Sequence, residues 1–228
     1  MSETETGNET GNETGNETET ETGNETETRT TAVGVPDGTD TTDHAGTDPS
    51  RTKGATVWLT GLPSAGKTTL AFALAGRLRA EGRRVEVLDG DEMRTFLSAG
   101  LGFGRQDRDT HVGRMGFVAE LLARNGVLAL VPVIAPYADG REAVRRRHAA
   151  SGTPYVQVHV ATPVEVCSVR DVKGLYAQQA AGEISGLTGV DDPYEEPAAP
   201  DLRIPTQHLT VAESVAAIHA HLDERNLA

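Results

Sequence analysis

Apolar and polar residues follow each other in blocks that predict strands and helices in turn. From residue 55 onward, short apolar runs are followed by segments in which apolar residues recur every three or four positions. The first pattern is typical of buried strands and the second of amphipathic helices. We predict strands in residues 55–60, 83–91, 127–136, 155–160 and 201–204, and helices in 67–82, 108–126, 139–150, 163–171 and 210–225.

Particular residues mark the ends of these predicted helices. Gly82 stops the first helix, and Pro163 opens the fourth. Thr210 and Glu213 have the spacing of a capping box at the start of the last helix. In the third helix, the arginines at 145–147 predict an exposed, solvated face.

The alternation of strands with helices predicts an α/β fold, in which helices flank both faces of a parallel sheet. Residues 201–204 are expected to form an edge strand. Ligands of such sheets bind beyond the carboxyl ends of the strands. Glycines and charged residues follow the predicted strands in 61–68, 89–91, 135–141 and 170–173. We therefore expect the functional site at this end of the sheet.

Residues 1–52 differ in composition from the rest of the chain. They begin with a degenerate repeat of Gly-Asn-Glu-Thr units, and the first 50 residues hold 13 acidic residues and one basic residue, Arg29. So little apolar surface cannot offset the entropy of ordering. We predict a disordered acidic tail in 1–52 and one folded domain in 53–228.

The formal net charge of −13 belongs mainly to this tail, because the other residues are nearly neutral in sum. A near-neutral domain argues against broad nucleic-acid binding, which needs clustered basic charge. No apolar run is long enough for a membrane span, and the acidic start resembles neither a signal nor a transit peptide. The single cysteine, Cys167, excludes an internal disulfide. We therefore expect a cytoplasmic protein.

The segment "GLPSAGKT" at 61–68 fits the phosphate-loop signature, with glycines at both ends of the loop and Lys67 and Thr68 after it. Its backbone N–H groups can surround an anion at a helix N-terminus. Lys67 can reach the β- and γ-phosphates of a nucleoside triphosphate, and Thr68 can bind Mg²⁺. The predicted ATP-binding residues of the loop are Gly61, Leu62, Pro63, Ser64, Ala65, Gly66, Lys67, Thr68 and Thr69. No Asn-Lys-x-Asp segment accompanies the loop, which favours a small-molecule kinase over a GTPase.

The turn "LDGDEMR" at 88–94 carries the second candidate group. One carboxylate of Asp89 and Asp91 can organise Mg²⁺, and the other can accept a proton from an attacking hydroxyl. Arg94 lies one helical turn after Asp91 and can bind an anion. The alternative is a polar turn in which Asp89 or Asp91 only caps a helix.

Five segments together resemble the adenylylsulfate kinase family. They are "DGDEMR" at 89–94, "GLGFGRQDRDTHVGRMGFVAEL" at 100–121, "VIAPYADGREAVR" at 133–145, "VEVCSVRDVKGLYAQQAAGEISGLTGVDDPYEEP" at 164–197 and "TQHLTVAESV" at 206–215. The resemblance extends from about Gly54 to the end of the chain. It implies a P-loop kinase fold and the transfer of phosphate from ATP to adenylylsulfate, giving 3′-phosphoadenylylsulfate.

The resemblance also implies roles for matching residues. Asp89 and Asp91 match paired aspartates near Mg²⁺ and the 3′-hydroxyl, and either can be the base; Asp91 is our first candidate, with Asp89 beside the metal. Lys173 matches a lid lysine that reaches the reacting phosphates, so the implied catalytic set includes Lys67 and Lys173. Arg170, at the start of the lid, joins the ATP-binding set. The implied substrate-binding residues are Asp91, Arg94, Phe103, Arg108, His111, Ile134, Lys173 and Leu187, with arginines for the phosphosulfate and Phe103 for the adenine.

Four positions depart from the family pattern. A serine described as a phosphorylated intermediate is Ala135 here, an asparagine is His111, a phenylalanine is Leu187 and a basic residue is Ala138. Alanine cannot carry phosphate, and the nearest other acceptor in the sequence, Tyr137, is a weak nucleophile at neutral pH. We therefore expect direct transfer from ATP.

Two other hypotheses remain open at this point. The chain is alternatively an inactive nucleotide-binding subunit of a sulfate-activation complex, or a kinase for the hydroxyl of another small molecule. The resemblance leaves open a homodimer and a functional coupling to sulfate adenylyltransferase. The expected cofactors are ATP and Mg²⁺, and no nucleic acid or membrane partner is expected.

Overall fold

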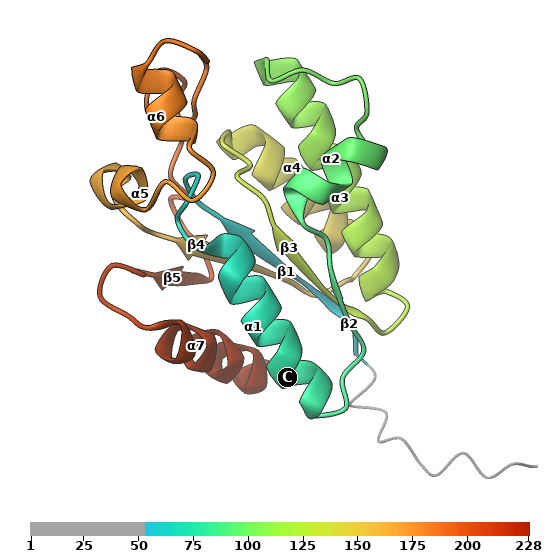
Figure 1. The fold of residues 1–228 in the computed structure, drawn as a ribbon. Helices are drawn as coiled ribbons and strands as arrows, with labels where there is room; N and C mark the ends of the chain where they lie inside the picture. The colour runs from blue at the N-terminus through green and yellow to red at the C-terminus, as the bar shows by residue number, and fades with distance from the viewer. Residues whose placement is uncertain (1–52) are drawn as a thin grey trace, which may run out of the picture. The chain divides into compact units, whose positions relative to one another are not determined.

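The structure, a computed structural model, describes residues 53–228. Figure 1 shows a central sheet with helices packed on both of its faces. The chain runs through alternating strands and helices, which confirms the α/β fold predicted from the sequence. The predicted disorder of the tail falls on residues 1–52 and lies outside the described residues.

Five parallel strands form the sheet in the order β2-β3-β1-β4-β5. The strands are β1 (Ala55–Thr60), β2 (Val85–Val87), β3 (Leu128–Pro132), β4 (Tyr155–Val160) and β5 (Leu202–Ile204). The central β1 pairs with β3 and β4, and its side chains are fully buried. The short β5 lies at one edge, as the sequence predicts.

Seven helices connect or follow the described strands. They are α1 (Lys67–Ala80), α2 (Gly90–Phe96), α3 (Arg105–Ala123), α4 (Ala138–Ala150), α5 (Val164–Arg170), α6 (Leu175–Ala180) and α7 (Val211–Glu224). The capping box at the start of α7 is present: the Thr210 hydroxyl accepts a hydrogen bond from the Glu213 backbone N–H, and the Glu213 carboxylate accepts one from the Thr210 backbone N–H. Such a cap stabilises a helix start by satisfying donors that lack a partner within the helix.

Alternate residues of β1 enter two apolar clusters on opposite faces of the sheet. Val57 and Leu59 belong to the cluster beneath α1 and α7, whereas Trp58 belongs to the cluster beneath α3 and α4. Figure 1 shows α1 beside α7 on one side. This period of two is what a strand buried on both faces requires. The phosphate loop therefore follows β1, which is paired with a strand on each side and packed against an apolar cluster on each face.

The structure corrects several predicted details. The predicted strand 83–91 is regular only over Val85–Val87, and the predicted helix 108–126 begins earlier, at Arg105. The helix α6 was not predicted, and α2 was foreseen only through the alternative in which Asp89 or Asp91 caps a helix. The arginines at 145–147 do not form a uniformly solvated face, because Arg147 pairs with the buried Glu120 at 3.0 Å and Arg145 with Asp201 at 2.9 Å. Buried or half-buried carboxylates require such partners.

Candidate active site

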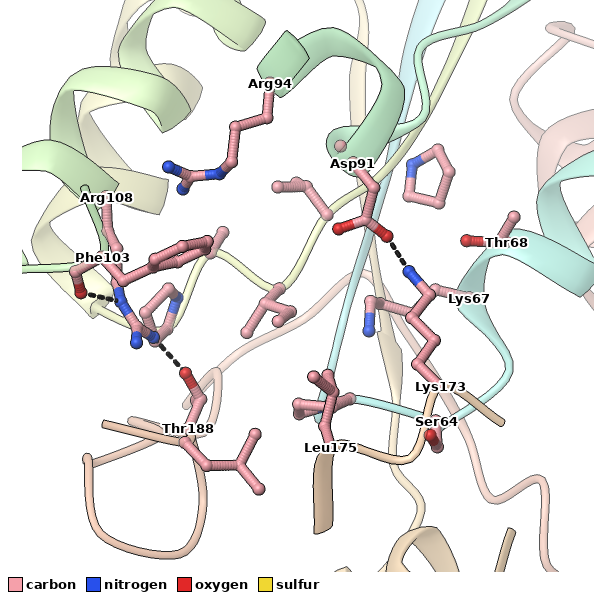
Figure 2. A pocket seen from close by; sticks show the side chains of 18 of the residues that line it. Ser64, Lys67, Thr68, Asp91, Arg94, Phe103, Arg108, Lys173, Leu175 and Thr188 are labelled. Atoms are coloured by element: carbon pink, nitrogen blue, oxygen red, sulfur yellow. Dashed lines mark hydrogen bonds and ion pairs between the residues drawn. The ribbon is translucent and has the colours of Figure 1, made fainter. Parts of the chain in front are cut away.

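A cavity of about 590 Å³ opens between the phosphate loop, α2, α3 and the segment around α6. Figure 2 shows Lys67, Thr68, Asp91 and Lys173 gathered in one part and Arg94, Phe103 and Arg108 in another. Four cationic side chains line the cavity: Lys67, Arg94, Arg108 and Lys173. The one carboxylate among the described lining residues is that of Asp91. This excess of positive charge favours an anionic ligand.

The phosphate loop presents its anion-binding backbone to this cavity. Gly66 has a φ of 103°, a left-handed conformation that favours glycine. Lys67 follows at the first residue of α1, and its ammonium donates to the Leu62 carbonyl at 2.7 Å. Burial lowers the pKa of Lys67 to about 8. A bound phosphate chain would supply the negative charge that favours the ammonium form.

Of the predicted ATP-binding set, six residues line the cavity: Pro63, Ser64, Gly66, Lys67, Thr68 and Thr69. Gly61, Leu62, Ala65 and Arg170 are not among the lining residues. Instead, the Arg170 guanidinium donates to the Ala65 carbonyl at 3.3 Å and to the Thr206 hydroxyl at 2.9 Å. Arg170 thus lies against the phosphate loop in this structure.

Asp89 is fixed in place by three donors. Its carboxylate accepts from the Thr68 hydroxyl at 2.8 Å and from the backbone N–H groups of Asp91 and Glu92 at 3.0 and 3.4 Å. The last two bonds make Asp89 the N-cap of α2. Asp89 therefore caps a helix, as the alternative from the sequence stated. It also contacts Thr68, as its proposed role beside the metal requires.

Asp91 has a different environment from Asp89. Its side chain is 71% exposed and forms an ion pair with the Lys173 ammonium, which comes from the loop between α5 and α6. Figure 2 shows this pair bridging the cavity close to Lys67. A carboxylate with an open side toward the cavity is available to a ligand, whereas Asp89 is already occupied.

Arg94 and Phe103, two of the predicted substrate-binding residues, lie in contact with each other. The Arg94 guanidinium lies 4.6 Å from the centre of the Phe103 ring and donates to the Gly102 carbonyl at 2.8 Å. Phe103 is 68% exposed, which excludes an ordinary core position. The ring therefore offers an aromatic face beside a cation, a surface suited to a base and its anionic group.

Arg108 is buried and extensively bonded, rather than the solvated start of a helix. Its guanidinium donates to the Phe103 carbonyl at 2.5 Å, to the Gly186 carbonyl at 2.6 Å and to the Thr188 hydroxyl. It also lies 3.2 Å from the Asp192 carboxylate. Arg108 thus joins α3 to the loop that follows α6, while its charge remains in the cavity lining.

The remaining predicted substrate residues also line the cavity: His111, Ile134 and Leu187. His111 Nδ1 lies 2.8 Å from the Ser98 hydroxyl, and burial lowers the pKa of the imidazole to about 4. His111 is therefore neutral near pH 7. Ala135 is buried in the same wall, with a left-handed φ of 44°.

Sequence reasoning missed several polar residues around the site. Thr188 and Asp192 bind Arg108, while Thr162, Thr206 and Tyr176 bind carbonyls of the phosphate loop. These partners are tens of residues apart in the chain, so no local pattern could have identified them.

Within residues 53–228, no cluster of three or more His, Cys, Asp or Glu side chains could hold a metal ion unaided. In the same range, no helix combines the length and apolarity that crossing a bilayer requires.

Comparison with known proteins matches residues 53–205 to the family model described as adenylylsulphate kinase. The chain belongs to the adenylylsulphate kinase family. The "Adenylyl-sulfate kinase" of Rippkaea orientalis is 52% identical over 174 residues, which cover 75% of this chain and 93% of that relative. The corresponding protein of Myxococcus xanthus is 48% identical, covering 78% and 95%.

Solved structures of this kinase family share the same fold. The APS kinase of Mycobacterium tuberculosis, in complex with AMPPNP and APS, is 42% identical with a TM-score of 0.73, covering 75% of this chain and 98% of that chain. A hexameric APS kinase from Thiobacillus denitrificans is 36% identical with a TM-score of 0.60, covering 78% of this chain and 30% of that one.

Proposed function

We propose that this chain transfers the γ-phosphoryl group of ATP to the 3′-hydroxyl of adenylylsulfate, giving ADP and 3′-phosphoadenylylsulfate. The observation that carries the proposal is the single cavity lined by the phosphate loop and by Arg94, Phe103 and Arg108. The loop suits the triphosphate, and the arginine–aromatic group suits an adenylated phosphosulfate. Membership of the adenylylsulphate kinase family supports the same substrates.

The residues present fit Mg²⁺ as the metal. Mg²⁺ is held mainly by water, substrate phosphates and one or two carboxylates, so it needs no cage made only of protein groups. The Thr68 hydroxyl and the Asp89 carboxylate, 2.8 Å apart, are oxygen ligands at the mouth of the phosphate loop. Bound there, Mg²⁺ would neutralise charge on the β- and γ-phosphates. We assign Thr68 and Asp89 to the metal.

We assign Asp91 as the base that accepts the proton of the 3′-hydroxyl. Asp89 already accepts three hydrogen bonds, whereas Asp91 has one ionic partner and an exposed side chain. Lys67 holds the β- and γ-phosphates. When these phosphates are bound, the Lys173 ammonium exchanges its ion pair with Asp91 for one with the reacting phosphates. Positioning and charge neutralisation of this kind supply most of the catalysis in phosphoryl transfer.

Transfer is direct, with both substrates bound together. Ala135 has no nucleophilic atom, and the nearest alternative, Tyr137, is 3% exposed. The Tyr137 hydroxyl donates to Asp192 at 3.0 Å, and burial together with this carboxylate raises the pKa of the phenol. A phenol so held is a poor phosphate acceptor at neutral pH.

A product assay tests the proposal. Purified chain, ATP, Mg²⁺ and adenylylsulfate should yield ADP and 3′-phosphoadenylylsulfate in equal amounts. Omission of adenylylsulfate should leave only slow ATP hydrolysis. Binding of ATP without turnover would favour the inactive-subunit alternative, which Ala135 alone supports. Turnover with another hydroxyl compound but not with adenylylsulfate would favour a different small-molecule kinase.

Assembly and partners follow as further proposals. The hexameric relative from Thiobacillus denitrificans supports self-association, and light scattering of the purified chain tests whether it is a dimer. A relative from Sorangium cellulosum named "Probable bifunctional SAT/APS kinase 2" is 48% identical to this chain, which covers 29% of its length. This supports a functional coupling to sulfate adenylyltransferase. A cytoplasmic location stays a prediction.

A further inference from the structure

The carbonyl of Ala65, a phosphate-loop residue that does not line the cavity, has three donors within reach. The hydroxyls of Thr162 and Thr206 each lie 3.1 Å from this oxygen, and the Arg170 guanidinium lies 3.3 Å from it. Thr162 follows β4 and Thr206 follows β5, so two strands hold a loop that belongs to a third.

A second carbonyl of the loop has its own donor. The Tyr176 hydroxyl, from the buried face of α6, donates to the Pro63 carbonyl at 3.2 Å. In a planar trans peptide, a carbonyl and the N–H of the next residue point in opposite directions. Bonds that hold the Pro63 and Ala65 carbonyls outward therefore direct the N–H groups of Ser64 and Gly66 toward the other side. Ser64 and Gly66 both line the cavity.

The two threonine hydroxyls form a connected pair. Their oxygens lie 2.6 Å apart, and Arg170 donates to Thr206 at 2.9 Å. Each hydroxyl has one hydrogen, so one can donate to Ala65 while the other donates to its neighbour. Thr162 is 5% exposed and Ala65 is fully buried. The bond to Ala65 therefore lies where water has little access to replace it.

We propose that Thr162 and Thr206 are positioning residues for the phosphates of ATP. They act through the Ala65 peptide, holding the Gly66 N–H in its anion-binding direction before the nucleotide arrives. Without them only the 3.3 Å contact from Arg170 holds the Ala65 carbonyl, so the peptide rotates more freely and binding must supply the cost of ordering it. This inference rests on the proposed function, because it takes ATP as the ligand of the loop.

The test measures the affinity for ADP by calorimetry, which does not depend on turnover. Thr162→Val and Thr206→Val each leave the other hydroxyl free to reach Ala65, so each should weaken ADP binding only about 2- to 3-fold. The double variant removes both hydroxyl donors and leaves only the longer contact from Arg170 at 3.3 Å, so it should weaken binding about 10-fold or more, beyond the product of the single effects. In steady-state kinetics, the KM for ATP should rise and the KM for adenylylsulfate should stay unchanged.

Matched variants separate positioning from general packing. Thr56→Val removes a buried hydroxyl that binds His148 at 2.9 Å at the opposite end of β1, and it should leave ADP affinity unchanged. Thr188→Val removes a bond to Arg108 and should raise the KM for adenylylsulfate instead. Thr162→Ser keeps the hydroxyl and should bind ADP as the wild type does.

The outcomes distinguish this inference from the proposed function. If the wild type binds ADP and the folded double variant binds it equally well, the positioning role alone is overturned. A wild-type chain that does not bind ADP would overturn the proposed function and this inference with it. If the double variant fails to fold, a second pair, Thr206→Val with Tyr176→Phe, removes one hydroxyl donor to the Ala65 carbonyl and the hydroxyl donor to the Pro63 carbonyl. That variant should also weaken ADP binding several-fold, and unchanged affinity would again reject the role.

Discussion

Stability and turnover should separate the roles of the two aspartates after β2. Replacing Asp89 by alanine removes the N-cap of α2 and the acceptor for the Thr68 hydroxyl. Replacing Asp91 by alanine removes only an exposed carboxylate and its ion pair with Lys173. We predict that Asp89→Ala lowers both stability and activity, whereas Asp91→Ala lowers mainly activity.

The magnitudes follow from the contacts. Loss of an N-cap costs about 1 kcal/mol, and loss of the bond from Thr68 costs roughly another 1 kcal/mol. In a domain of this size, each kcal/mol shifts Tm by about 2–4 °C, so Asp89→Ala should lower Tm by about 4–8 °C. The exposed pair of Asp91 contributes about 1 kcal/mol or less, and its loss should shift Tm by at most a few degrees. Loss of a general base should lower kcat about 100-fold or more.

Calorimetric melting and a coupled ADP-release assay measure the two effects. Asp89→Asn is the matched control, because asparagine also caps helices through its Oδ1, while its Nδ2 can donate to the Thr68 hydroxyl instead of accepting from it. This variant should keep Tm near the wild-type value but need more Mg²⁺ for half-maximal activity, since it lacks the charge. Wild-type kcat in Asp91→Ala would refute the assignment of the base. An unchanged Tm in Asp89→Ala would refute the reasoning about the cap.

Three further predictions concern the phosphate loop, Ala135 and the acidic tail. Because the pKa of Lys67 is about 8 in the folded chain and 10.5 ordinarily, kcat/KM for ATP should fall as pH rises through about 8. Between these two pKa values the unfolded chain holds the Lys67 proton and the folded chain does not, so the contribution of Lys67 to the free energy of unfolding should increase with pH across that window. The Lys67→Ala variant should lose this stability trend, and its kcat should fall by orders of magnitude while the chain stays folded. Ala135→Ser should gain little activity, and γ-labelled ATP should leave no stable label on the protein; ping-pong kinetics or a labelled protein that chases into product would contradict direct transfer. A chain beginning at Arg51 should keep its Tm and kinetics, because the removed residues carry almost no apolar surface; a large loss in either would show that the tail packs or regulates.

The sequence was most informative where local physics determines the structure. The apolar run at 155–160 coincides with β4, and the spacing of Thr210 and Glu213 gave the capping box of α7. By contrast, α2 and α6 span only seven and six residues, too short for a helical period to stand out. Their positions depend on contacts such as the carboxylate of Asp89 and the buried hydroxyl of Tyr176.

Side-chain partners distant in the chain were beyond local reasoning. Arg108 was expected to bind substrate, but the structure surrounds it with acceptors from a loop about 80 residues further along. The distinction between Asp89 and Asp91 likewise appears only when Thr68 and Lys173 are brought to them by the fold. Residue types, spacing and the family resemblance pointed to many of the residues that line the cavity, while their separate roles require the three-dimensional contacts.

The two edges of the sheet have a consequence for behaviour at high concentration. Edge strands with unpaired backbone groups can recruit strands of neighbouring molecules and begin aggregation. Here β2 and β5 have only three residues each, and each carries an exposed charge at its centre, Glu86 and Arg203. An incoming strand would find few backbone partners and would have to desolvate that charge. The long apolar strands are thus shielded inside the sheet, which disfavours edge-to-edge association between folded molecules.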